Sequence, residues 1–129
     1  MTDVPAENEL PTGEVRVEPD GAAAIVVLHG EHDLTTAGRV RVALDEAVDG
    51  GRPVVLDVSG TSFMDTSVLH ALFSASTRLK ADGRRLVVQC PAGLAIYRVF
   101  EVSGLVAEVA FCETREDALA QAGNRERLT

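Results

Sequence analysis

Residues 53–69 read PVVLDVSGTSFMDTSVL and combine the signals of a strand, a loop and the start of a helix. Its first half, Val54–Val58, is a short apolar and β-branched run of the kind found in a buried strand. Residues 59–62, SGTS, have the composition of a loop. Asp65 is a good N-cap, because its side chain can accept a hydrogen bond from a free backbone N–H group. The stretch therefore predicts a strand that leads through a loop into a helix.

Strand signals precede this stretch. Val15 and Val17 alternate with charged neighbours, and the dipeptide at 20–21, Asp-Gly, is typical of a turn. An apolar run at residues 24–28 then indicates a buried strand that ends at Gly30. The first two strands are therefore expected to pair antiparallel through the turn.

Two long helices are indicated by apolar residues spaced three and four apart. The first helix is expected to be capped by Thr35 or Thr36 and to be stopped by the glycines at 50–51. Its apolar face consists of Val40, Ala43, Leu44, Ala47 and Val48. The second helix follows Asp65, and its apolar face consists of Leu69, Leu72, Phe73, Ser76 and Leu79.

Shorter elements follow. A strand is expected at 86–88, a short helix opening at Pro91, a last strand within 106–111, and a helix capped by Thr114 and Asp117. Strands separated by helices of this length imply crossover connections and a largely parallel sheet. The sequence thus predicts one α/β domain with a mixed, mostly parallel sheet of four to five strands and about four helices. This domain spans 14–122, between a flexible arm at 1–13 and a flexible tail at 123–129.

The composition and charge of the chain exclude some classes of function. The net charge is −8 and the sequence pI is about 4.8. Nucleic-acid binding needs a basic surface, so it is not expected. The sequence shows neither a signal peptide nor an apolar run long enough to span a bilayer, which predicts a cytoplasmic protein without membrane contact. Cys90 and Cys112 are expected to behave as small buried hydrophobes.

Enzyme signatures are missing from the sequence. Ser67, His70 and Asp33 can be combined on paper into a catalytic triad, but any chain offers such combinations. There is no G-x-S-x-G, P-loop, G-x-G-x-x-G or H-E-x-x-H pattern. His29 and His32 are three residues apart near a strand end, which does not favour a shared metal ion. We expect neither an enzyme, nor a cofactor, nor a metal site.

Thr66 and Ser67 are the most informative polar residues. Both would lie in the first turn of the helix capped by Asp65, where free N–H groups and the helix dipole favour a phosphate. The phosphate would also add about −1.5 to −2 charge beside Asp65. The alternative is that both residues are ordinary helix-start residues, which are common there. The residues alone leave both interpretations open.

Three segments resemble the STAS domain of bacterial anti-sigma factor antagonists. Residues 30–33, GEHD, resemble the family's G-E-[LI]-D stretch, and residues 54–57 resemble its strand that ends in an aspartate. Residues 64–69, MDTSVL, resemble the phosphorylatable segment M-D-S-S/T-G-L. Residues 99–105, VFEVSGL, resemble the L-F-x-x-S-G-L end of a helix. The order and the spacings hold over about a hundred residues, so the sequence is identified as a member of this family.

The resemblance implies a partner switch in bacterial stress or sporulation signalling. In the family, the unphosphorylated antagonist binds an anti-sigma factor, which is a serine/threonine kinase, and a sigma factor is released. The kinase phosphorylates the residue after the motif aspartate, which ends binding, and a phosphatase resets the switch. That residue is Thr66 here, with Ser67 as the second candidate. The implied partner-binding residues are Asp33, Met64, Asp65, Thr66, Ser67, Val68 and Leu69.

Family members also include scaffolds and small-ligand or nucleotide sensors that are not phosphorylated, which is the alternative function. The sequence departs from the antagonist pattern at three positions. Thr66 replaces the usual serine. Val68 replaces a glycine, and its bulk is expected to hinder close approach of a partner backbone. His32 replaces an aliphatic residue and is expected either to face solvent or, near Thr66, to modulate the local charge.

Overall fold

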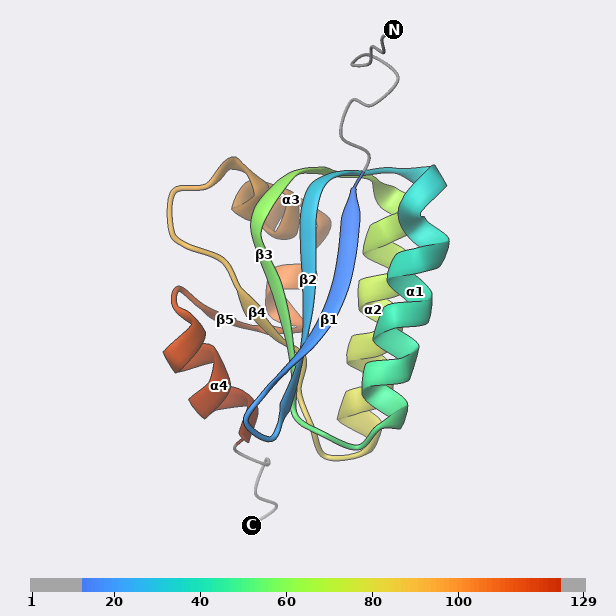
Figure 1. Cartoon of the computed structure of the whole chain (residues 1–129). Helices are drawn as coiled ribbons and strands as arrows, with labels where there is room; N and C mark the ends of the chain where they lie inside the picture. Colours follow the sequence, from blue (N-terminus) through green and yellow to red (C-terminus); the bar gives the residue numbers. More distant parts are fainter. Residues whose placement is uncertain (1–12, 124–129) are drawn as a thin grey trace, which may run out of the picture.

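The structure is a computed structural model that describes residues 13–123. Most of the predicted arm at 1–13 and tail at 123–129 therefore lies outside the described residues. Within the described part, no helix is long and apolar enough to cross a membrane. The chain between Gly13 and Gly123 forms one mixed sheet covered by helices on both faces (Figure 1).

The sheet has five strands in the spatial order β1-β2-β3-β4-β5. The first pair is antiparallel, and each later neighbour is parallel. The strands are β1 (Glu14–Asp20), β2 (Ala23–His32), β3 (Val54–Met64), β4 (Val87–Gln89) and β5 (Ala110–Cys112). This confirms the predicted mixed and mostly parallel sheet. Gly21, with φ of 61°, occupies the predicted turn between β1 and β2.

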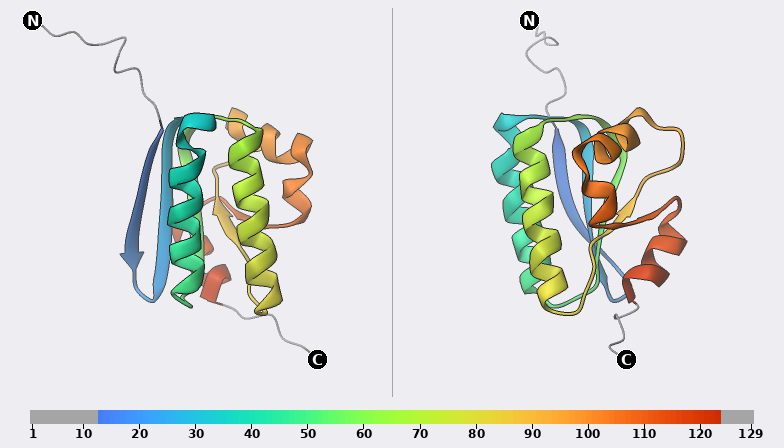
Figure 2. Two further views of the ribbon diagram at one scale, coloured as in Figure 1. Left: turned by 90° about the vertical axis from the view of Figure 1, so that its right-hand side faces the viewer. Right: turned by 180° about the vertical axis from the view of Figure 1, so that it is seen from behind.

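The four α-helices are divided unequally between the two faces of the sheet. They are α1 (Leu34–Asp49), α2 (Thr66–Ala81), α3 (Ala95–Ser103) and α4 (Arg115–Gly123), with a short 3-10 helix at Leu105–Ala107. Helices α1 and α2 lie side by side on one face, and α4 lies on the other (Figures 1 and 2). Helix α3 packs on the same core as α1 and α2.

Two hydrophobic cores explain the apolar run in β2. Val26 and Leu28 point into the larger core beneath α1, α2 and α3. Ile25 points the opposite way, into a smaller core that α4 covers through Ala118. Because neighbouring side chains on a strand alternate between faces, a strand buried on both faces is apolar at every position. The predicted apolar faces of α1 and α2 lie in the larger core, with Phe73 at its margin.

Both central strands extend beyond their predicted ends. Strand β2 does not stop at Gly30 but continues to His32, and β3 includes the predicted loop at 59–62. The reason is backbone pairing, which is independent of side-chain polarity: His32 pairs with Met64 at the far end of both strands. Thr61 also donates its hydroxyl to the carbonyl oxygen of Leu28, at 2.9 Å.

The short elements are displaced from their predicted positions. Helix α3 begins at Ala95 and not at Pro91, because the chain still turns through Gly93, whose φ is 86°. The last strand covers only 110–112. In the final helix, the backbone N–H of Asp117 donates to the hydroxyl of Thr114 at 3.1 Å, which is the Thr114 half of the predicted cap.

Candidate functional site

Two helices begin at the same end of the sheet, each behind an aspartate. Asp33 caps α1, and its carboxylate accepts hydrogen bonds from the backbone N–H and the hydroxyl of Thr35, at 2.9 and 2.6 Å. Asp65 caps α2 in the same way, accepting from the backbone N–H and the hydroxyl of Ser67 at 2.9 and 2.5 Å. The cap of α2 is as predicted. The cap of α1 is Asp33, so the prediction of Thr35 or Thr36 was wrong.

The two capping segments are tied together through His32. The backbone N–H of Asp65 donates to the carbonyl oxygen of His32 at 3.0 Å. Asp33 follows directly in the chain, so both carboxylates are held at the ends of paired strands. Hydrogen bonds from the Thr35 hydroxyl and backbone hold the pKa of Asp33 below its ordinary value. This carboxylate therefore stays ionised at neutral pH.

His32 is buried, so the expectation of a solvent-facing histidine was wrong. Its Nε2 lies 3.2 Å from the carbonyl oxygen of His29, to which it donates. Its Nδ1 lies 3.1 Å from the hydroxyl oxygen of Thr36, and that hydroxyl donates to the carbonyl oxygen of Asp33, also at 3.1 Å. Burial lowers the pKa of His32 below 6.5. A Cβ at Gly13 would lie 2.2 Å from the imidazole ring, so the chain passes closely over it. The ring is thus a neutral packing element behind the caps.

The two candidate phosphorylation residues differ in access. Thr66 is the first residue of α2 and is exposed, and its hydroxyl makes no hydrogen bond with any residue between 13 and 123. Ser67 is half-buried, and its hydroxyl is bound to the Asp65 carboxylate. Of the two hydroxyls, the one on Thr66 is therefore the more accessible to a phosphoryl donor.

The neighbouring apolar residues turn inward. Val68 has no exposed surface, Met64 is 3% exposed and Leu69 is 9% exposed, and all three pack in the larger core. The expectation that Val68 adds bulk on the partner side was therefore wrong. Met64 and Val68 support the helix start from within, so a partner would meet the exposed residues around them.

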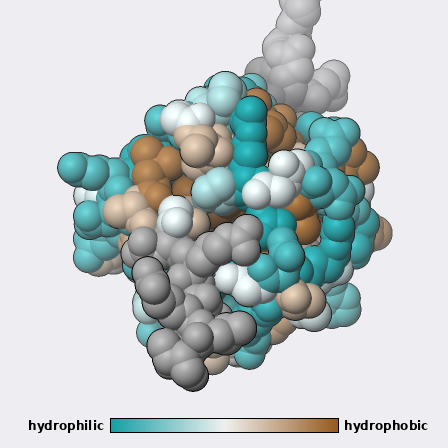
Figure 3. All heavy atoms as spheres, turned by 90° about the horizontal axis from the view of Figure 1, so that it is seen from below, coloured by the Kyte–Doolittle hydropathy of each residue, from teal (hydrophilic) through white to brown (hydrophobic). Residues whose placement is uncertain are grey.

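Exposed apolar side chains surround the helix starts, which the sequence did not reveal. Leu34, the first residue of α1, is 74% exposed, and Phe63, near the end of β3, is 47% exposed. Leu94, the N-cap of α3, is 36% exposed. The opposite end, seen from below in Figure 3, shows hydrophobic residues interspersed among hydrophilic ones. Exposed apolar side chains beside the helix caps are candidates for burial against a partner.

A groove of about 620 Å³ separates α2 from α3 and begins at Thr66. Its walls are mainly apolar, with Arg98 and His70 as the charged or ionisable members. The lining consists of Thr66, Leu69, His70 and Phe73 from α2, and Ala95, Arg98, Val99, Val102 and Ser103 from α3. The candidate acceptor hydroxyl therefore stands at the edge of an apolar groove.

Comparison with known proteins identifies the family. The sequence profile of the STAS domain matches residues 14–118. The chain belongs to the STAS domain family. The match begins where the predicted domain does and ends inside α4.

Several relatives of this STAS domain carry a named function. The anti-sigma F factor antagonist of Paenibacillus polymyxa is 26% identical over 110 residues, covering 84% of this chain and 93% of the relative. An anti-sigma factor antagonist from Mycobacterium paratuberculosis shares the fold, with a TM-score of 0.76, 24% identity and coverage of 88% and 96% of the two chains. The phosphorylated form of the Bacillus cell fate determinant SpoIIAA matches at a TM-score of 0.63, with 23% identity and 83% and 97% coverage.

The residues suggested for a triad do not form one in this STAS domain. Ser67 and Asp33 are each bound within their own helix cap, and no hydrogen bond joins either to His70 in the described part of the chain. No group of three or more His, Cys, Asp or Glu side chains among residues 13–123 is placed to hold a metal ion. Burial raises the pKa values of Cys90 and Cys112, which lie in different cores.

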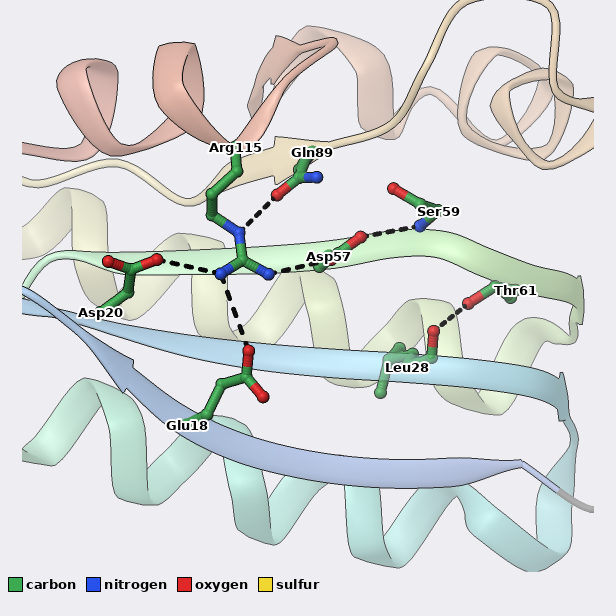
Figure 4. A network of polar contacts seen from close by, with 8 residues as sticks. All are labelled: Glu18, Asp20, Leu28, Asp57, Ser59, Thr61, Gln89 and Arg115. Carbon is green, nitrogen blue, oxygen red and sulfur yellow. Dashed lines mark hydrogen bonds and ion pairs between the residues drawn. The ribbon is translucent and has the colours of Figure 1, made fainter.

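A second polar cluster lies on the α4 face of the sheet and was not predicted (Figure 4). The Arg115 guanidinium, at the start of α4, contacts carboxylates of Asp20 and Asp57 at 3.1 and 3.2 Å and of Glu18 at 3.7 Å. Its Nε donates to Gln89 at 2.9 Å. This one side chain therefore joins α4 to strands β1, β3 and β4. No local sequence signal marks these partners, because they are far apart along the chain.

Proposed function

We propose that this STAS domain is an anti-sigma factor antagonist that binds an anti-sigma factor serine/threonine kinase and thereby releases a sigma factor. Phosphorylation of Thr66 by that kinase ends the interaction, and a phosphatase restores it. The observation that carries the proposal is the hydroxyl of Thr66 at the start of α2, which is exposed and makes no hydrogen bond with residues 13–123. Exposed apolar side chains lie near the same helix starts. The relatives named as antagonists support the same assignment.

The binding surface would be the end of the molecule where α1 and α2 begin. Leu34 and Phe63 offer apolar area that water solvates poorly, so their burial against a partner is favourable. Asp33 and Asp65 flank this area, and both belong to helix caps, so their positions are fixed before binding. Such preorganisation lowers the entropic cost of association.

Phosphorylation would act at the centre of this surface. A phosphate on Thr66 adds about −1.5 to −2 charge at pH 7 next to the Asp65 carboxylate. An apolar or acidic partner surface would then have to desolvate or face a cluster of negative charges. A loss of about 3 kcal/mol would weaken binding more than 100-fold. The fold itself need not change.

Paired captures from a lysate of the source organism test the proposal. The baits are the wild type, Thr66→Ala and Thr66→Glu, with Thr77→Glu as the charge-matched control on the exposed far part of α2. Wild type, Thr66→Ala and Thr77→Glu should retain a serine/threonine kinase of the histidine-kinase fold, and Thr66→Glu should not. Equal capture by Thr66→Glu would contradict the switch, and absence of the kinase from every bait would contradict antagonism.

The groove between α2 and α3 favours a second candidate, a sensor of a small ligand or nucleotide. Its volume of about 620 Å³ lies in the range of small-molecule sites. A ligand that binds the native state raises the melting temperature. A thermal-shift screen with GTP, ATP and lipids tests this candidate. A dose-dependent rise that is lost in Phe73→Ala would favour the sensor.

A further inference from the structure

The cationic residue of the α2–α3 groove has no partner in the described part of the chain. Arg98 is exposed, lines the groove together with Thr66, and makes no hydrogen bond or ion pair with residues 13–123. Arg115 and Arg78, in contrast, each contact more than one carboxylate. An arginine held beside a candidate phosphorylation residue and free of other carboxylates is available to bind an anion.

The packing of α3 directs Arg98 toward α2. Ile96 and Phe100 lie on the buried side of α3, at 2% and 0% exposure. The ring of Phe100 packs against Phe111 in an edge-to-face contact, with 5.2 Å between ring centroids. Arg98 is three residues after Ala95 and four before Val102, so it shares the helical face that lines the groove. The anchors fix the helix, and Arg98 stands at the exposed margin of that face, away from the core.

We propose that phosphothreonine 66 is bound within the same chain by Arg98, across the groove between α2 and α3. This inference rests on the proposed function, because it requires a phosphate on Thr66. The guanidinium presents paired N–H donors whose spacing matches two phosphate oxygens. Both residues are exposed, so solvent screens the pair, and the double charge of the phosphate supplies the attraction.

The charges around Thr66 favour an orientation of the phosphate toward the groove between α2 and α3. Asp65 and Asp33 lie on the loop side of the phosphate and repel it. His70 is four residues after Thr66 on α2, so it lies on the same helical face and lines the groove beside it. The phosphate is therefore repelled on the loop side and attracted on the groove side. Its pairing with Arg98 closes the mouth of the groove.

The internal pair would give phosphorylation a second way to weaken partner binding, in addition to charge repulsion. Repulsion by the phosphate disfavours a partner at the helix starts, and the pair with Arg98 also covers apolar surface that the partner could use. The phosphorylated chain would then be held in its own closed arrangement. Removing Arg98 should leave the added charge intact but open the groove again.

The test places phosphothreonine at position 66 of the full chain by genetic encoding, so no kinase is required. The second pKa of the phosphate, ordinarily about 6, is measured by ³¹P NMR titration. A neighbouring cation favours the dianion, so the pKa should lie about one unit lower with Arg98 than in Arg98→Gln. Arg41→Gln removes an equal charge from an exposed position on α1 that does not line the groove, and should match the wild type.

The result separates the two proposals. A lower phosphate pKa in the wild type and in Arg41→Gln than in Arg98→Gln supports the internal pair, whatever a kinase capture shows. An equal phosphate pKa in all three proteins overturns the internal pair, even if the kinase capture supports the switch.

Discussion

Val68→Gly restores the residue that the antagonist pattern has at this position, and it should destabilise the protein. Val68 is fully buried in the larger core, so the change removes three carbon atoms from a closely packed site. At about 0.8 kcal/mol per buried carbon, this costs about 2.4 kcal/mol. Glycine is also worse than valine within a helix by roughly 0.5 kcal/mol. We expect a loss of about 3 kcal/mol in the free energy of unfolding.

Urea denaturation followed by circular dichroism measures this loss. The matched control is Val42→Gly, in α1, where the side chain is 56% exposed. This control changes the helix propensity in the same way but removes little buried area, so it should cost at most about 1 kcal/mol. If the two variants lose equal stability, Val68 is not a core residue. The interpretation of its bulk as a surface feature would then return.

The remaining predictions concern the buried His32 behind the helix caps and the Arg115 cluster on the α4 face of the sheet. Because burial lowers the pKa of His32, the unfolded chain binds a proton more readily than the folded one, and stability is lost as the pH falls below about 6.5. Between pH 7 and 5 the melting temperature of the wild type should fall more steeply than that of His32→Leu, and parallel profiles would contradict this. Arg115→Ala leaves Asp57, whose side chain is 14% exposed, without its cation. It should cost about 1–2 kcal/mol in urea denaturation, against less than about 1 kcal/mol for the exposed Arg78→Ala, and equal losses would argue against the cluster as a clamp.

The arrangement of the sheet could be predicted because the spacing of apolar residues within each strand and helix shows which of its faces are buried. The apolar run at 24–28 and the helical spacing from Val40 to Val48 each report which faces are covered. The ends of β2 and β3 could not be predicted in this way. Residues 59–62 look like a loop, yet their backbone pairs with β2, and that pairing depends on a strand thirty residues away in the chain.

The site could be predicted only in part. Asp65 as a cap and Thr66 in the first turn of α2 follow from capping preferences, which are local. The groove between α2 and α3 does not, because Thr66 and Arg98 come to line one groove only through the packing of α3 on the core. The exposure of Leu34 also carries no signal of its own. Its position directly after the capping Asp33 becomes informative only when α1 is placed against the sheet.

The structure changes the meaning of the departures from the antagonist pattern. His32 replaces an aliphatic residue and Val68 replaces a glycine, and both side chains point into the protein. They therefore alter what supports the helix starts, and a partner would not contact either side chain. Thr66 is the one departure of the three that is exposed, and it keeps the hydroxyl that a phosphoryl transfer needs. A partner would thus distinguish this surface from the family pattern at position 66 by a single methyl group.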